Sequence, residues 1–224
     1  HLIREHFEWL FEESNRVLLI DEFDAVARSR ASQEMHSDEK ADVNEMLVQL
    51  DKATRRGSMV ICTTNYLASL DDAVLRSGRF SHFLPVPPPD QEASVAIVSY
   101  YLDRLGKDEA GNRDERLQVE TPSADRVAEM VSELWSNGVR GSGRICGADL
   151  EAAVNAAYIG AARDASRTGT NERNHVVVTE ERLRYAFRNT RRSISVESMR
   201  RFLDEIEAHS SEDVFRSYQA MLAL

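Results

Sequence analysis

The hydrophobic positions follow two patterns, and the pattern changes near residue 88. In the first part, short apolar runs within 17–21 and 59–64 each follow a segment with helical spacing, at 2–13 and 42–50. A short run that is apolar at every position is typical of a strand buried on both faces, as in a parallel sheet. We therefore predict a helix–strand–helix–strand order, and an α/β arrangement, for this part.

A group of prolines between residues 85 and 89 ends this part of the chain. Proline cannot donate a hydrogen bond to a strand ladder, so we predict a hinge or boundary here, after a last strand at 82–86. Apolar residues recur at helical spacing from 93 onward. The predicted organisation is an α/β domain at 1–88 followed by an all-α domain at 89–224.

Two acidic residues, Asp21 and Glu22, directly follow the first apolar run. Carboxylates at the end of a buried strand are costly to bury without a cation. A Mg²⁺-nucleotide would supply that cation: an Asp can hold the ion directly or through its waters, and a neighbouring Glu can polarise an attacking water. The alternative is an acidic loop that follows a core strand.

The second apolar run ends at Asn65, and two arginines, Arg76 and Arg79, follow it around a glycine. An amide can orient a water or contact a terminal phosphate without adding charge. The planar guanidinium suits phosphate oxygens, and an arginine donated from outside a site can stabilise phosphoryl transfer. The alternative is a solvated surface pair.

Taken in this order, the motifs resemble those of the AAA family of ATPases. Asp21 and Glu22 resemble the Walker B pair, within the sequence DEFD. Asn65 matches the family's sensor-1 position, and Arg76 and Arg79 match its two arginine-finger positions.

The resemblance continues into the second part. Gly147 and Ala148 resemble the start of the family's lid helix, where the backbone lies against the adenine. Arg144 precedes that helix; in some relatives of the superfamily an arginine near this point touches the γ-phosphate, but we favour a solvated side chain. The resemblance implies a partial RecA-like (P-loop NTPase) parallel sheet with flanking helices, followed by an all-α lid domain.

The resemblance also implies ATP and Mg²⁺ as cofactors and ATP hydrolysis as the activity. Asp21 would hold Mg²⁺ through water, Glu22 would activate the lytic water, and Asn65 would position it. Both arginines would reach the site of a neighbouring subunit in a homo-oligomeric, hexameric ring that remodels or unfolds proteins. Two alternatives stay open: a non-catalytic scaffold or regulatory ring subunit, and a clamp-loader-like DNA machine.

The chain departs from the family pattern in three places. No Gly-x-x-x-x-Gly-Lys-Ser/Thr loop occurs, and we expect that phosphate loop to precede His1 in a longer protein, so that this chain alone is inactive. Ser81-His82 stands where the family often has Asp-Arg, and Cys146 stands where a small residue is common. The polar segment 28–40 is either a solvated connection or, by resemblance, a second pore loop.

The composition limits the partners and the cellular location that we expect for this chain. The formal charge of −10 and pI near 5.2 argue against a nucleic-acid groove as the main surface. With only two cysteines we expect no structural disulfide, which fits a reducing, cytoplasmic location. No apolar run is long enough to span a membrane, and no histidine has the spacing of a zinc ligand.

Overall fold

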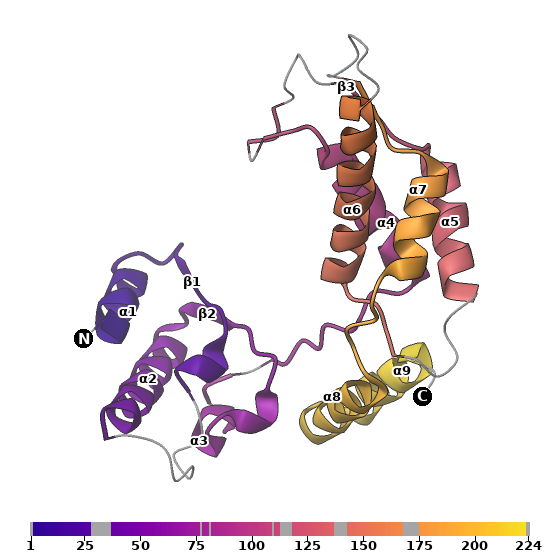
Figure 1. Ribbon diagram of the computed structural model, residues 1–224. Coiled ribbons are helices and arrows are strands. Elements are labelled where there is room, and N and C mark those ends of the chain that lie inside the picture. The colour runs from indigo at the N-terminus through magenta and orange to yellow at the C-terminus, as the bar shows by residue number, and fades with distance from the viewer. Residues whose placement is uncertain are drawn as a thin grey trace. The chain divides into compact units, whose positions relative to one another are not determined.

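The computed structural model describes residues 2–27, 37–76, 78–80, 82–108, 110–112, 118–136, 143–167 and 175–222 (Figure 1). The chain divides into two compact units. His1–Pro85 with Glu205–Glu212 form the first, here called the α/β unit, and Val86–Asp204 with Asp213–Leu224 form the second, the helical unit. The chain passes from one to the other within the proline segment.

The α/β unit is built on two parallel strands. Its elements are α1 (Leu2–Glu12), β1 (Val17–Ile20), a 3₁₀ turn (Phe23–Ala25), α2 (Ser37–Arg56), β2 (Met59–Cys62), a second 3₁₀ turn (Leu67–Ser69) and α3 (Asp72–Leu75). Val17 pairs with Met59 and Ile20 with Cys62, so both strands end at the same edge. The predicted parallel α/β arrangement is confirmed.

Helices α1 and α2 cover one face of the strand pair. The core there holds side chains that are almost fully buried, including Phe7, Leu10, Leu18, Val43 and Leu50. Each such side chain contributes roughly 1.5–3 kcal/mol when buried. Burial of this face fixes the register, since a shift of one residue would turn Leu18 to the opposite side.

The prediction that the strands are buried on both faces is wrong for the described chain. Leu18 is 8% exposed, but its neighbours Val17 and Leu19 are 46% and 61% exposed. Met59 and Ile61 of β2 are exposed on the same side. A parallel sheet is buried on both sides only where helices cover both, and the described helices of this unit pack on one.

The predicted strand at 82–86 does not form. This segment has no regular structure, and Leu84 and Val86 are 86% and 83% exposed. A strand needs a neighbour to pair its N–H and C=O groups, and no described strand lies beside this segment.

The helical unit begins after the prolines. Its helices are α4 (Gln91–Arg104), α5 (Ala124–Ser136), α6 (Gly147–Arg167), α7 (Glu180–Asn189), α8 (Val196–His209, whose last turn belongs to the first unit) and α9 (Glu212–Leu222). Asp90 caps α4 through the N–H of Ala93 at 2.8 Å. Thr179 caps α7 through the N–H of Arg182 at 3.3 Å. Both are N-terminal residue types that accept from an otherwise unpaired amide.

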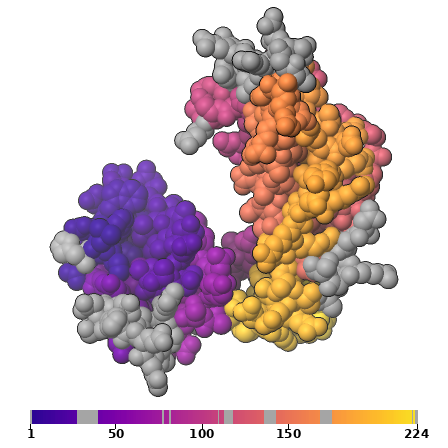
Figure 2. All heavy atoms as spheres, viewed as in Figure 1, coloured from indigo at the N-terminus to yellow at the C-terminus, as the bar shows by residue number. Residues whose placement is uncertain are grey.

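The core of the helical unit lies between α4, α5, α6 and α7. Its fully buried members include Val98, Val131, Leu150, Val154 and Leu183. In Figure 2, α6 and α7 form one continuous surface of this unit.

A small sheet interrupts the predicted all-α character of this unit. β3 (Gln118–Glu120) and β4 (His175–Val177) pair in parallel. Each has three residues, too few to show the alternation that predicts a strand, and both lie in segments rich in charge.

Both cysteines are free, as the sequence predicts. Burial raises the pKa of the Cys62 thiol to about 12, so this thiol stays protonated at neutral pH. None of the described helices is both long and apolar enough to cross a membrane.

The contact between α1 and α2 is sensitive to pH. Arg4 donates to both oxygens of Glu45, each at 3.0 Å, and the buried Gln49 amide donates to the same carboxylate at 2.7 Å. The hydrogen bond from Arg4, and then the one from Gln49, lower the pKa of Glu45 to about 2. Because the folded pKa is depressed, the stabilisation is complete above the ordinary glutamate pKa and disappears as the pH falls toward 2.

We predict that Glu45→Gln slightly lowers the free energy of unfolding at pH 7, by the small amount expected of an exposed ion pair. The difference from the unaltered protein should narrow as the pH falls below about 4.5. Urea unfolding at a series of pH values measures this difference. Glu207→Gln, at an exposed position on α8, is the control, and a difference that stays constant down to acid pH would contradict the assignment.

Candidate functional site

The turn after β1 carries both acidic residues of the predicted site. Asp21 and Glu22 are exposed, whereas Phe23 enters the core at 1% exposure. Glu22 has φ 50° and ψ 49°, the left-handed conformation, and it is the one described non-glycine residue with positive φ. That conformation costs an L-residue about 1–2 kcal/mol and persists only where neighbouring contacts enforce it.

Thr63, the residue after β2, supplies those contacts. Its carbonyl accepts from the Phe23 N–H at 2.8 Å, and its hydroxyl accepts from the Glu22 N–H at 3.2 Å. The same hydroxyl donates to the Asp21 carboxylate. One residue therefore holds three consecutive residues of the acidic turn.

Thr64 makes a second link between the two turns. Its hydroxyl donates to Asp24 at 2.7 Å and accepts from the Tyr66 N–H at 3.0 Å. Asn65 lies between these contacts and is exposed. The structure thus brings Asp21, Glu22 and Asn65 to one edge of the sheet, where the sequence predicts them to meet.

Neither threonine was among the predicted site residues. The signal was present, because small polar residues end the second apolar run. Spacing alone does not show that a hydroxyl there reaches a carboxylate some forty residues earlier, whereas the parallel register does.

The oxygen-rich edge fits a magnesium ion held through water. Mg²⁺ favours oxygen ligands, keeps several waters and is often bound through one or two carboxylates together with phosphates. Asp21 and Glu22 provide exposed carboxylates of this kind. Among the described residues, no three His, Cys, Asp or Glu side chains form a group that could hold a metal ion.

The two predicted arginines lie in different environments. Arg76, directly after α3, is exposed. Arg79 is half-buried: its Nε and Nη2 donate to the two oxygens of Asp51 on α2 at 2.8 and 3.2 Å, and its Nη1 donates to the Ala73 carbonyl. This structure therefore holds Arg79 within its own chain, and the arginine-finger role of both residues stays a prediction.

An aromatic contact connects the arginine segment to the acidic turn. The rings of Phe23 and Phe80 meet edge to face, with centroids 5.8 Å apart. Phe23 follows Glu22 and Phe80 follows Arg79, so packing in the core restrains both turns together.

The predicted adenine contacts belong to the helical unit. Gly147 and Ala148 form the first turn of α6. Asp149 stabilises this start by accepting from the Cys146 N–H at 2.9 Å and from the Ser193 hydroxyl at 2.7 Å. Burial acts to raise the pKa of Asp149, but these hydrogen bonds outweigh it and the pKa is lowered.

The prediction of a solvated Arg144 is wrong. Arg144 is half-buried and donates to the Leu222 carbonyl at 2.7 Å, and its guanidinium lies 5.4 Å from the Trp135 ring centre. Its backbone also pairs with Ile194. A cation at a helix C-terminus satisfies an otherwise unpaired carbonyl, so Arg144 stabilises the end of α9.

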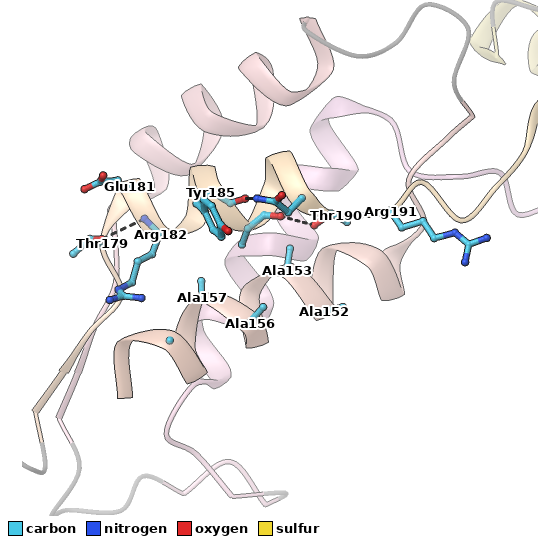
Figure 3. A pocket seen from close by; sticks show the side chains of 13 residues that line it. Ala152, Ala153, Ala156, Ala157, Thr179, Glu181, Arg182, Tyr185, Thr190 and Arg191 are labelled. Atoms are coloured by element: carbon cyan, nitrogen blue, oxygen red, sulfur yellow. Dashed lines mark hydrogen bonds between the residues drawn. The ribbon is translucent and has the colours of Figure 1, made fainter. Parts of the chain in front are cut away.

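A groove with a volume of about 830 Å³ lies between α6 and α7 (Figure 3). Ala152, Ala156 and Gly160 of α6 line it together with Tyr185 of α7. Arg182 crosses above Gly160, where a Cβ would lie 2.7 Å from its Nη1, and pairs with Asp164. None of the predicted site residues lines this groove. The predicted second pore loop lies largely outside the described residues, which omit 28–36.

The strain at Glu22 gives a direct test of the turn. We predict that Glu22→Gly is more stable than Glu22→Ala by about 1 kcal/mol, because glycine adopts the left-handed conformation without the Cβ cost. Chemical unfolding of both variants gives the difference. Equal stabilities, or a more stable alanine variant, would show that Glu22 is not held in this conformation.

The comparisons with known proteins agree with this geometry. Residues 1–88 match the model of the ATPase family associated with various cellular activities (AAA). The chain is 31% identical over 163 residues to the ATP-dependent zinc metalloprotease YME1 homolog of Caenorhabditis elegans, covering 72% of this chain and 20% of that protein. It is 33% identical over 110 residues to the proteasome-activating nucleotidase of Methanosphaerula palustris, covering 48% of this chain and 27% of that protein.

The fold is similar to that of the FIGL-1 AAA domain. The crystal structure of that domain matches with a TM-score of 0.70 and 22% identity, over 94% of this chain and 62% of the other. Its complex with ADP matches with a TM-score of 0.68 and 20% identity, over 93% and 63%. With its parallel strands that end in the acidic pair and in Asn65, the part of the chain at 1–88 belongs to the ATPase family associated with various cellular activities, AAA.

Proposed function

We propose that the protein containing this chain hydrolyses ATP in a ring of identical subunits, a hexamer, and uses the energy to unfold or remodel other proteins. The observation that carries the proposal is the junction at the sheet edge, where Thr63 binds the turn that contains Asp21 and Glu22. The chain spans between a fifth and about a quarter of the length of the two relatives described above, so the activity belongs to the whole protein.

Each residue at the edge has a distinct role in this proposal. Asp21 holds Mg²⁺ through its water shell, and the bound ion neutralises charge on the phosphates. Glu22 accepts a proton from the attacking water and orients it. Asn65 contributes its amide to that water or to the terminal phosphate, which adds no charge to an already acidic edge.

The arginines act on the site of the neighbouring subunit. Arg76 is exposed. Arg79 has to exchange Asp51 for a phosphate oxygen, and both partners suit the planar guanidinium. No protomer then holds a complete site, so hydrolysis depends on assembly.

Adenine binds against the backbone of Gly147 and Ala148, at the start of α6. One structure of similar fold is the FIGL-1 AAA domain in complex with ADP, which is consistent with a nucleotide site in this fold. Two free cysteines are compatible with a reducing, cytoplasmic setting.

Protein, rather than nucleic acid, is the proposed substrate. The relatives are named as ATP-dependent proteases and a proteasome-activating nucleotidase. The net charge of −10 disfavours a polyanion as partner. A non-catalytic scaffold is the alternative, and it has no use for a strained Glu22 beside a second acid.

We predict that Glu22→Gln in the full-length protein abolishes ATP turnover but keeps ATP bound, because the amide preserves the shape of the side chain and cannot accept the proton. Steady-state hydrolysis and equilibrium ATP binding measure the two effects, with and without an unfolded polypeptide or DNA. Turnover at the rate of the unaltered protein would contradict the role of Glu22. Absence of turnover in the unaltered protein would favour the scaffold.

We predict that Arg79→Ala also abolishes turnover, and that mixing it with Glu22→Gln subunits restores part of it. A mixed ring contains sites with Glu22 from one subunit and Arg79 from the next. Asp51→Ala is the matched control, since it breaks the same ion pair but keeps the guanidinium, and it should retain turnover. Equal loss in both variants, without rescue on mixing, would mean that Arg79 acts only through the ion pair.

A further inference from the structure

We propose that Thr63 is a positioning residue for the acidic pair: its hydroxyl fixes the carboxylate of Asp21 and the backbone of Glu22 for the Mg²⁺-nucleotide. The inference rests on the proposed function. It assigns a role to a residue that the sequence motifs do not include.

The hydroxyl of Thr63 serves both acids at once. A hydroxyl has one proton to donate and lone pairs that accept. Here the hydroxyl donates a hydrogen bond to Asp21 Oδ1, and one of its lone pairs accepts a hydrogen bond from the Glu22 N–H at 3.2 Å. The rotation of one carboxylate and the backbone of the next residue are therefore set by a single side-chain atom.

The backbone of Thr63 makes the hydrogen bonds that join the end of β2 to β1 and to the turn after it. Its N–H donates to the Ile20 carbonyl at 3.0 Å, and its carbonyl accepts from the Phe23 N–H at 2.8 Å. Any residue except proline could make those two bonds at this position. Thr63 is also exposed, so its side chain is not needed to fill the core. The described contacts made by its hydroxyl are those to the two acidic residues.

The direction of the hydrogen bond matters for a cation. Because Thr63 donates to Oδ1, one of the carboxylate's acceptor sites is occupied and its orientation is restrained, while the remaining sites can face the ion's water shell. Groups that orient metal-binding carboxylates in this way commonly change metal affinity 10–100-fold when they are removed. The bond to Glu22 N–H, in turn, helps hold the left-handed turn that directs this side chain away from the core.

The neighbouring threonine offers a matched comparison. Thr64 uses its hydroxyl in the same way, but on Asp24 and on the Tyr66 N–H. Valine has the shape of threonine without the hydroxyl. Thr63→Val and Thr64→Val therefore remove equivalent groups one residue apart, and only the first removes a contact with Asp21 or Glu22.

The experiment measures binding and local protection instead of turnover, in the full-length protein. Mn²⁺ takes the place of Mg²⁺, and electron paramagnetic resonance follows its binding in the presence of a non-hydrolysable ATP analogue. We expect Thr63→Val to weaken Mn²⁺ binding about tenfold. Thr63→Ser, which keeps the hydroxyl, should restore it, and Thr64→Val should leave it unchanged.

Hydrogen exchange without nucleotide gives the second readout. In Thr63→Val the amide of Glu22 should exchange several-fold faster, since it loses its acceptor. In Thr64→Val the faster amide should be that of Tyr66.

These outcomes separate the two proposals. Equal Mn²⁺ affinity in Thr63→Val and the unaltered protein, or unchanged exchange at Glu22, would overturn the role of Thr63 and leave the ATPase proposal standing. Failure of the unaltered protein to bind Mn²⁺ with the ATP analogue would overturn the proposed function and, with it, this role.

Discussion

The structure depends on the parallel pairing of β1 and β2 and on the residue that closes their common edge. Pairing Val17 with Met59 and Ile20 with Cys62 makes both strands end together. Thr63 then binds the turn after β1 through backbone and hydroxyl. Without this register, Asp21 and Asn65 would lie on unrelated parts of the surface, and the order of acids, amide and arginines along the chain would not bring them together in space.

The left-handed conformation of Glu22 and the burial of Phe23 belong to the same turn and depend on each other. Phe23 is buried, and burial of a phenylalanine contributes roughly 1.5–3 kcal/mol, which offsets the cost of about 1–2 kcal/mol for a left-handed residue. The turn therefore places one residue in the core and holds the preceding carboxylate in solvent. Phe80 packs on the same ring, so the segment that carries the arginines is restrained by the same hydrophobic contact.

Much of the architecture could be predicted from the sequence, because apolar runs and helical periodicity report burial directly. The parallel pair and the helices around residues 2–13, 93–105 and 148–165 follow from such patterns. The strand expected at 82–86 fails for a reason no local pattern contains: its apolar residues need a neighbouring strand. β3 and β4 are too short to leave a pattern. Arg144 looks like a solvated side chain in a glycine-rich loop, and only the fold brings the Leu222 carbonyl to it.

For the site, the types of residue could be predicted but not their contacts. Acids after one strand and an amide after the next indicate a nucleotide edge, and the register brings them together. The ion pair of Arg79 with Asp51 and the hydroxyl of Thr63 are tertiary contacts between segments some thirty and forty residues apart. Such contacts determine which side chains of the site are held by other residues of the chain. The spacing of residues in the sequence does not predict these contacts.

The most direct test of the central claim is an experimental structure of the full-length protein with Mg²⁺ and a non-hydrolysable ATP analogue. We expect the terminal phosphate beside Asn65, and Mg²⁺ separated from Asp21 by no more than its own water shell. Phosphates bound away from the edge formed by Asp21, Glu22 and Asn65 would contradict the account.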